Sequence, residues 1–582
     1  MTAMPRRPPP AAPLVALALL LAPRPGVASA DDHGAGAHPV DAADVAAGLR
    51  IYREGILPDG RPLRAVAQSG TIRSGADAAC TACHRRSGYG TSEGPVTIPS
   101  ITATALFGWS ERPPERPLVP GAAGGLSPAN ATVAAQAALS AARLARIAAA
   151  RGAQRRPPYD EASLARAIRA GVDVTGRPLA HGMPRYALGD EDLRVLLAYL
   201  RTLSTGPAPG VTAEEIHFAT VIEPGVDPAR RRAMLDVMEA FVRDKNAGTR
   251  KEDRRRSAGT EREYRAYRTW ILHVWDLSGQ PESWGRQLEE RYRRQPVFAL
   301  IGGLGPSGWG PVHRFSEQYG VPCLFPQVDL PAAAPGFYTL YLSRGLPLEA
   351  EALAAWLREH PPAGGVTQVF RQEEASAAAA AAFRTALPEG ARPAERVVDG
   401  PPSREFWDRL AAERAGGAVV LWLPKSDLAE AGGLVGPASP VGAVYLSATL
   451  LGSARPATWD GGGPVRLLHP LDLPQARGSR LLRVKRWLHD RAIPLLDEKV
   501  QMNAYFAVAV TADAVGQTSD LFSREYLVER LEHMVGNTVT PSIYPRVSLG
   551  PDQRFASKGS YIVRPGGRGA DDLEPVSGWV TP

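Results

Sequence analysis

The chain has 582 residues, 44% of them hydrophobic and 22% charged, which is enough for two or three compact domains and excludes wholesale disorder. The formal net charge of +7 is only a weak argument for nucleic acid, and we expect no nucleic-acid partner. The densest basic run, 250–256, is interrupted by acidic residues, which favours a solvated surface.

The first thirty residues form a compositional block of their own. Arg6 and Arg7 precede a short apolar run, and the block ends with small residues at 27–30. This pattern predicts a secretory leader at 1–30, cut after Ala30. A membrane anchor is the alternative, but the run is shorter than a bilayer-spanning helix. No later segment has the length and hydropathy of a span, so we expect a periplasmic protein without a membrane span in the mature chain.

Composition also divides the rest of the chain. A polar spacer at 31–40 precedes a unit at 41–203, and the Pro- and Gly-rich stretch at 204–214 reads as a linker. A second unit covers 215–565, and 566–582 is expected to be a C-terminal tail. The fold class we predict is therefore multidomain.

The run from Cys80 to His84, Cys-Thr-Ala-Cys-His, carries the most specific chemistry in the sequence. In this spacing two thiols add to the vinyl groups of a haem, and the adjacent imidazole binds its iron. A zinc site would need four ligands, and the single further cysteine, Cys323, lies in an apolar strand-like run typical of a buried thiol. A thioredoxin-like dithiol would not require His84. We predict one covalent haem c on Cys80 and Cys83.

Residues 41–203, which contain this motif, resemble class I c-type cytochromes. Residues 44–52 and 190–200 look like the family's N-terminal and C-terminal helices. The resemblance implies an all-α domain in which the two helices cross closely, with Tyr199 over Gly48.

The same resemblance implies the iron ligands. Met183 matches the distal ligand opposite His84, and His181 is its rival. Both axial positions would then be filled, which favours electron transfer over oxygen chemistry. The second ring nitrogen of His84 would bind a backbone carbonyl at Pro95 or Pro99. His84 and Met183 lie far apart in sequence for this family, so we expect an insertion over about 112–158.

The second unit alternates strand-like and helical patterns. Strands are predicted at 216–222, 269–275, 297–301, 366–370, 418–423 and 441–446, with amphipathic helices between them. This rhythm predicts parallel sheets covered on both faces.

This unit resembles type I periplasmic binding proteins of the branched-chain amino-acid and amide-binding kind. The resemblance rests on 297–303, on 319–322, on 503–505, which looks like a helix start, and on 553–555 with 560–563. It implies two α/β lobes with a ligand between them, held by loops at the carboxyl ends of strands and by helix N-termini.

Candidate ligand-binding residues follow by matching position. Ser307 would bind a ligand carboxylate, and Asp427 would face an ammonium group. Asp329 sits where a small hydroxyl residue is usual, and this departure leaves the ligand open, as does Ser376 in a loop that is usually glycine-containing. Trp309 and Trp422 are expected to wall the cleft.

Residues 303–308 also match the Gly-x-Gly-x-x-Gly dinucleotide fingerprint. Pro306 stiffens the turn, and the preceding strand is the third rather than the first. We therefore treat the match as accidental.

Two functions remain open. The first is a periplasmic electron-transfer cytochrome working between a dehydrogenase, possibly a quinoprotein, and a downstream acceptor, with a fused small-molecule-binding domain. The second is a solute-binding receptor for a transporter or sensor, in which the haem is a redox reporter. In neither does the sequence point to catalytic residues, and an oxidoreductase using the α/β unit ranks third.

Overall fold

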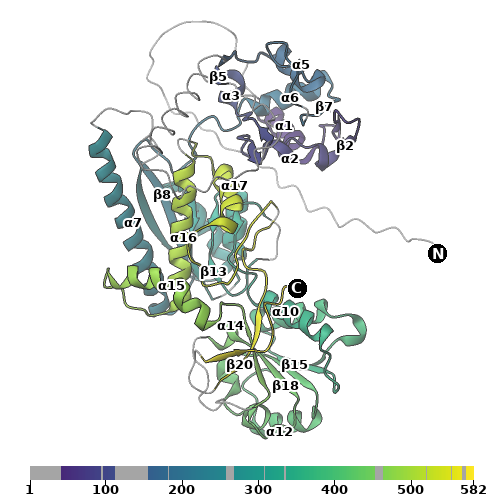
Figure 1. Cartoon of the computed structure of the whole chain (residues 1–582), viewed down its shortest axis with the longest axis vertical. Coiled ribbons are helices and arrows are strands. Elements are labelled where there is room, and N and C mark those ends of the chain that lie inside the picture. Colours follow the sequence, from purple (N-terminus) through teal and green to yellow (C-terminus); the bar gives the residue numbers. More distant parts are fainter. Residues whose placement is uncertain are drawn as a thin grey trace, which may run out of the picture.

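The computed structural model describes residues 41–93, 96–111, 155–180, 182–256, 268–306, 308–332, 336–452, 463–518, 521–551, 553–566 and 572–582. They form an N-terminal unit, 41–203, followed along one axis by two α/β lobes (Figure 1). The expected leader, the spacer and residues 112–154 lie outside the described residues, as do Pro95, His181 and Ser307. No described helix has the length and hydropathy to cross a membrane.

The N-terminal unit is mainly helical, but the expectation of an all-α domain was wrong. Three short strands form an antiparallel sheet in the order β2-β1-β7, and β7 directly follows the loop of Met183. Strands this short carry no alternating pattern, so periodicity does not reveal them. The elements are α1 (Ala42–Glu54), β1 (Arg64–Val66), β2 (Ile72–Ser74), α2 (Thr81–His84), β3 (Thr91–Glu93), β4 (Val96–Ile98), α3 (Ala103–Phe107), β5 (Ser110–Glu111), β6 (Arg155–Arg156), α5 (Glu161–Ala170), β7 (Arg185–Tyr186) and α6 (Asp190–Leu200).

The predicted crossing of the first and last helices is confirmed. A Cβ atom at Gly48 in α1 would lie 2.1 Å from the carbonyl oxygen of Val195 and 2.7 Å from the Cβ of Tyr199 in α6. Only glycine therefore allows this backbone approach. The ring of Tyr199 packs against Tyr52 with centroids 5.2 Å apart, which closes the core beneath the crossing.

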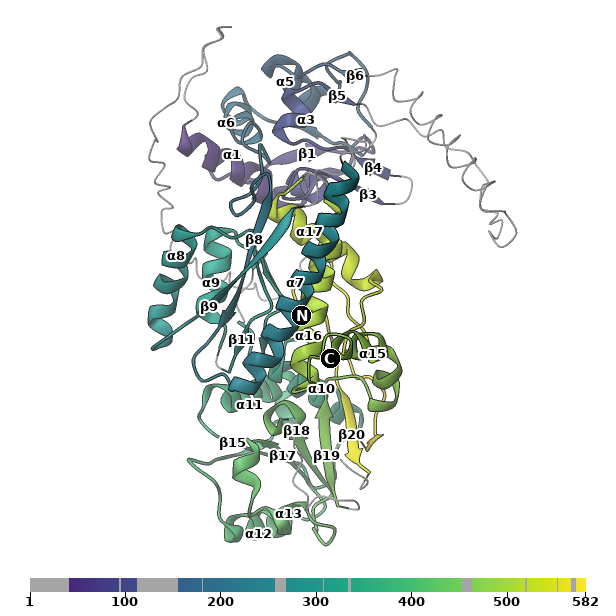
Figure 2. The same cartoon turned by 90° about the vertical axis from the view of Figure 1, so that its left-hand side faces the viewer.

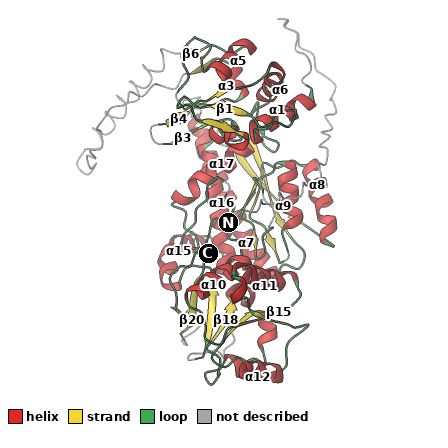
Figure 3. Cartoon of the chain, turned by 90° about the vertical axis from the view of Figure 1, so that its right-hand side faces the viewer, coloured by secondary structure: helices red, strands yellow, loops and turns green. Residues whose placement is uncertain are grey.

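The first lobe is a parallel sheet in the order β13-β11-β8-β10-β12-β14, with β9 also paired to β8. Phe218 and Ile222 of β8 pack on one side of the sheet, while Ala219 and Val221 pack on the other. Figures 2 and 3 show α8 and α9 on one side and α7 with α16 on the other. The elements are β8 (Glu215–Ile222), α7 (Pro228–Arg256), β9 (Thr269–Asp276), α8 (Trp284–Arg294), β10 (Ala299–Ile301), β11 (Leu304–Gly305), α9 (Gly310–Tyr319), β12 (Cys323–Leu324), β13 (Gln327–Val328) and β14 (Thr339–Leu340).

The second lobe holds a sheet in the order β16-β15-β17-β18-β19-β20-β21, parallel as far as β19 and antiparallel beyond it. The strand β21 lies in the segment expected to be a tail, so the sheet continues past residue 565. The elements are α10 (Leu346–Glu359), β15 (Val366–Phe370), α11 (Glu374–Ala386), β16 (Ala394–Val397), α12 (Arg404–Glu413), β17 (Ala418–Trp422), α13 (Gly432–Val435), β18 (Ala443–Ser447), α14 (Ala448–Leu451), β19 (Val465–His469), β20 (Tyr561–Pro565) and β21 (Leu573–Pro575).

The chain passes between the lobes three times: after β14, after β19 and before β20. Between the last two passages, α15 (Pro474–His489), α16 (Glu498–Gln517) and α17 (Arg524–Met534) pack on the core of the first lobe. The expected helix start at 503–505 was wrong. The helix begins at Glu498 because the Asp497 carboxylate accepts from the backbone N–H of Val500 at 2.9 Å and caps it.

The stretch at 204–214 is held against the first lobe. The backbone N–H of Ala208 donates to the Phe522 carbonyl at 2.8 Å, and the guanidinium of Arg524 donates to the Pro209 carbonyl at 3.0 Å. This stretch therefore fixes the N-terminal unit to α17 instead of tethering it loosely.

Candidate functional site

The predicted haem-attachment motif lies on the short helix α2, with Cys80 as its N-cap and His84 as its last residue. The His84 ring is buried, and its Nδ1 lies 3.1 Å from the carbonyl oxygen of Pro99, the expected contact. A carbonyl only accepts, so Nδ1 carries the proton. Burial lowers the pKa of His84, which favours the neutral ring. The lone pair is then on Nε2, the atom that would bind an iron.

The two cysteines are separate free thiols, partly buried. Burial raises the pKa of Cys80 to about 12, so it is held as a thiol. Cys80 and Met183 pack against the same apolar core of the N-terminal unit. Two thiols three residues apart, a neutral imidazole with one nitrogen bound, and a thioether on the shared core are together a donor set that fits haem c. In the described part of the chain no group of three or more His, Cys, Asp or Glu side chains could hold a metal ion.

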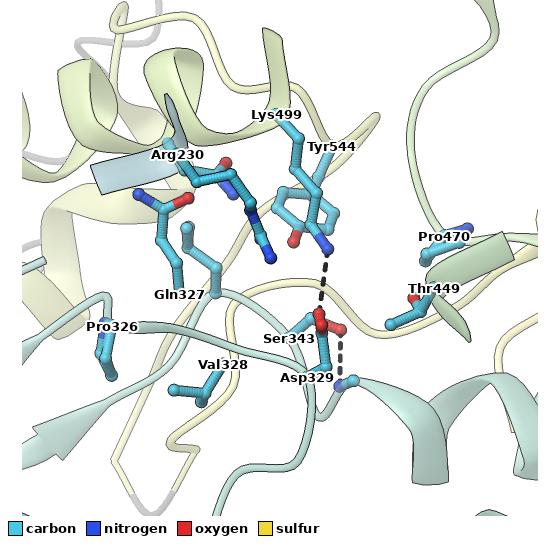
Figure 4. Close-up of a pocket in the computed structure, with 13 residues that line it drawn as sticks. Arg230, Pro326, Gln327, Val328, Asp329, Ser343, Thr449, Pro470, Lys499 and Tyr544 are labelled. Carbon is cyan, nitrogen blue, oxygen red and sulfur yellow. Dashed lines mark hydrogen bonds and ion pairs between the residues drawn. The ribbon is translucent and has the colours of Figure 1, made fainter. Parts of the chain in front are cut away.

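A second site is a pocket where the two lobes meet (Figure 4). Its volume is about 460 Å³, including the opening to solvent. Side chains of α7, β13 and α16 come from the first lobe and those of α14 and the end of β19 from the second. The lining residues are Arg230, Pro326, Gln327, Val328, Asp329, Leu342, Ser343, Gly345, Thr449, Pro470, Lys499, Asn503 and Tyr544.

Asp329 is the predicted ligand-binding residue that the structure places in this pocket. Its carboxylate lies 3.1 Å from the Nζ of Lys499 (Figure 4). Burial works to lower the pKa of Lys499, but the Asp329 carboxylate outweighs it and raises that pKa above its ordinary value. The amine therefore stays protonated, and the two side chains form a charged pair across the pocket wall.

Beside this pair, Glu349 at the start of α10 is fully buried. Its carboxylate accepts from the hydroxyl of Thr449, which lines the pocket. Burial raises the pKa of Glu349 to about 7, against the opposing effect of the Ser447 and Thr449 hydroxyls. The pocket thus borders a carboxyl group that titrates near neutrality.

Asp427 is not among the residues that line this pocket. It is buried in the second lobe and paired with Arg371, whose Nε lies 2.5 Å from the carboxylate. The positive group that faces it is thus an arginine of the same lobe. Its predicted contact with a ligand ammonium stays a prediction, as does the role of Ser307 outside the described residues.

The expectation that Trp309 and Trp422 wall the cleft was wrong. Both indoles are fully buried in the apolar cores of their lobes, and the Nε1 of Trp422 donates to the side chain of Gln368 at 3.0 Å. Burying a large aromatic ring removes a large apolar area from water, which is favourable, and the apolar faces of the two sheets allow complete burial. Ser376, expected in a loop, lies instead in the first turn of α11 and is also buried.

The glycine-rich stretch at 303–308 does not open a helix. It runs through β11, and α9 starts only at Gly310. Gly302 and Gly303 have φ angles of 61° and 116°, values that need glycine, and they turn the chain from β10 into β11. The dinucleotide context is absent from this segment, as the sequence indicated. Cys323, also as expected, is fully buried in β12.

Sequence reasoning missed most of the pocket. Arg230, Gln327, Lys499, Asn503 and Tyr544 come from distant parts of the chain. Of these, Asn503 alone lies in a stretch that the sequence singled out, and there it was expected as a helix start and not as a pocket residue. Lys499 is 170 positions from Asp329, so only a knowledge of how α16 packs could have paired them.

No protein-family model and no curated protein matches the chain. Solved structures similar to it include a putative branched-chain amino acid ABC transporter protein from Rhodospirillum rubrum, with 17% identity over 63% of this chain and 100% of that one and a TM-score of 0.44. A fatty acid ABC transporter substrate-binding protein from Thermomonospora curvata has 14% identity over 65% of this chain and 95% of its own, at a TM-score of 0.45.

A branched chain amino acid ABC transporter protein from Thermus thermophilus, solved with valine, has 13% identity over 64% of this chain and 98% of its own, at a TM-score of 0.45. These neighbours are type I periplasmic binding proteins. The two-lobed α/β architecture of this chain rests on its own sheets and crossings.

Proposed function

We propose that the chain is an exported, periplasmic solute-binding receptor that carries one covalent haem c as a redox reporter. The observation that carries the proposal is the pocket shared by the two lobes, because a ligand held by both lobes favours their closed arrangement. The receptor would serve a transporter or a sensor.

The haem is proposed from the donor set of the N-terminal unit. Cys80 and Cys83 would attach it, and His84 and Met183 would be its iron ligands. When bound, haem supplies a one-electron couple. The chain's own contribution is to hold the imidazole: the Pro99 carbonyl fixes Nδ1, so the ring presents Nε2 in one orientation.

Met183 supports a second candidate function, electron transfer. If the Met183 thioether and the His84 imidazole both bound the iron, the haem would suit electron transfer and not oxygen chemistry. The chain would then carry electrons between a periplasmic dehydrogenase, possibly a quinoprotein, and a downstream acceptor.

Reduced-minus-oxidised spectra of the purified full-length chain test the haem. We expect a covalent c-type spectrum that changes in Met183→Ala and is unchanged in the control Met534→Ala, which removes a partly buried methionine packed against the core of the first lobe. For attachment, Cys83→Ser should lose one thioether bond while Cys323→Ala loses none. Absence of covalent haem would refute the cytochrome part, and an unaltered spectrum in Met183→Ala would refute this ligand.

Potentiometry with and without bound solute separates the two functions. A reporter must change its reduction potential when the pocket fills. If a solute binds and the potential stays constant, the reporter role is refuted and the electron carrier is favoured. If no solute binds but the haem exchanges electrons with a dehydrogenase, the receptor is refuted.

A further inference from the structure

The charged side chains that line the pocket already have partners within the protein. Asp329 pairs with Lys499 at 3.1 Å, and the Nε of Arg230 lies 3.5 Å from the Asp497 carboxylate. Among the lining residues these are the charged ones. Figure 4 shows Lys499 and Asp329 pointing toward one another across the pocket. A charged ligand would therefore find no counter-charge without breaking one of these pairs.

Two neutral acceptors in the lining lack a hydrogen-bond donor among the described residues. They are the Oε1 of Gln327 and the Oδ1 of Asn503. The residues are 8% and 2% exposed, and the amide nitrogen of Gln327 is already used, donating to the Val500 carbonyl at 3.1 Å. Buried acceptors without donors are unfavourable and are usually satisfied by water or a ligand. The lining also holds one buried donor without a hydrogen-bond partner among the described residues, the Nε of Arg230, whose charge is met by Asp497. The pocket therefore offers two acceptors and one donor to a bound molecule.

The Glu349 carboxyl does not change which charged groups line the pocket. It lies behind Thr449, whose hydroxyl donates to it, and it is not part of the lining. The Ser447 hydroxyl also interacts with this carboxyl group. Glu349 is therefore occupied by hydroxyls of its own lobe and places no cation at the pocket.

We propose that the pocket binds a small uncharged molecule with at least two hydrogen-bond donors, a polyol or an amide. This inference rests on the proposed solute-binding function and names its ligand class. The donors of the ligand satisfy Gln327 Oε1 and Asn503 Oδ1, while the Asp329–Lys499 pair stays intact. A zwitterionic amino acid or a carboxylate is rejected, because its charge would be desolvated without a new partner.

Calorimetric titration of the full-length, haem-loaded chain tests the class with three groups of probes: glycerol and ethylene glycol, acetamide and urea, and leucine with propionate. We expect saturable binding in the first or second group, which also tells polyol from amide, and none in the third. Binding should be the same at low and high salt, since no charge is neutralised.

Saturable binding only in the third group, or affinity that falls steeply with salt, overturns the ligand class and leaves the receptor standing. No binding by any probe contradicts both the ligand class and the receptor function.

Two variants sharpen the test. Asn503→Leu should weaken binding about tenfold, the loss expected for one buried hydrogen bond, while Gln517→Leu, exposed on the same helix, should leave it unchanged.

Lys499→Met exposes the Asp329 carboxylate, so ethanolamine should now bind more tightly than ethylene glycol. Unchanged affinity in Asn503→Leu, or no gain for ethanolamine in Lys499→Met, contradicts the assigned contacts.

Discussion

The Glu529 carboxylate on α17 accepts two hydrogen bonds from Ser87, one from its backbone N–H at 2.9 Å and one from its hydroxyl at 2.5 Å. Ser87 lies just after His84, whereas α17 belongs to the first lobe. Tyr89 packs against Tyr526 beside this contact, with ring centroids 4.7 Å apart. The proposed haem-attachment segment is thus fixed directly to a helix that packs on the first lobe.

Removing this carboxylate should loosen the N-terminal unit from the first lobe. Glu529→Ala leaves the two Ser87 donors unpaired, a cost of about 1–3 kcal/mol for a buried contact. We expect the N-terminal unit and the first lobe to unfold in one calorimetric transition in the parent chain, and in a broader or divided transition in Glu529→Ala. Glu405→Ala, an exposed carboxylate in the second lobe, is the control. Identical transitions in the two variants would mean that this contact does not couple the units.

Stability should depend on pH through Glu349. Burial raises its pKa from 4.5 to about 7 in the folded chain, so between these values the folded state holds more protons than the unfolded state. The free energy of unfolding should therefore fall as the pH rises from 4.5 to 7 and then level off.

Glu349→Gln removes this dependence. Compared with the parent chain, the variant should be more stable above pH 7, by up to about 3 kcal/mol at 1.36 kcal/mol per pKa unit, with no such gain below pH 4.5. Urea unfolding across this range measures the effect, with Glu359→Gln, exposed at the other end of α10, as the control. A constant difference at every pH would contradict the linkage.

The helix crossing at Gly48 should not tolerate a side chain. In Gly48→Ala the new methyl group would overlap the Val195 carbonyl, and overpacking of this kind costs about 1–3 kcal/mol. We expect a lower melting temperature for the N-terminal unit. Near-ultraviolet circular dichroism, to which Tyr52 and Tyr199 contribute, measures this melting. Gly206→Ala, whose Cβ would meet nothing within 4 Å, should melt like the parent. Equal melting of the two variants would refute the crossing.

Arg524 holds several segments together and should not be replaceable by lysine. Its buried guanidinium donates to backbone carbonyls of Pro209, Val297 and Phe298 at 3.0, 2.6 and 3.1 Å. A lysine ammonium cannot span these positions, so Arg524→Lys should lose about 1–3 kcal/mol. Chemical denaturation measures the loss. Arg286→Lys, at an exposed site, should cost nothing measurable, and equal stability of the two variants would exclude this role.

Local patterns in the sequence determined a large part of the protein. The spacing of Cys80, Cys83 and His84 predicts haem attachment because that chemistry needs neighbouring residues. Alternating strands and helices predict parallel sheets covered by helices because apolar periodicity follows from backbone geometry. Their division into two lobes came from the family resemblance. The role of Gly48 came from the family resemblance, and the structure shows why a close helix crossing needs a glycine there.

The tertiary structure alone decided which distant residues meet. Asp329 finds Lys499 across 170 positions, and Ser87 finds Glu529 across 442. It also decided that Trp309 and Trp422 fill cores instead of lining a cleft. These outcomes depend on how whole helices and sheets pack. That packing is stabilised by many weak apolar contacts between residues far apart in the chain, so no short stretch of sequence predicts it.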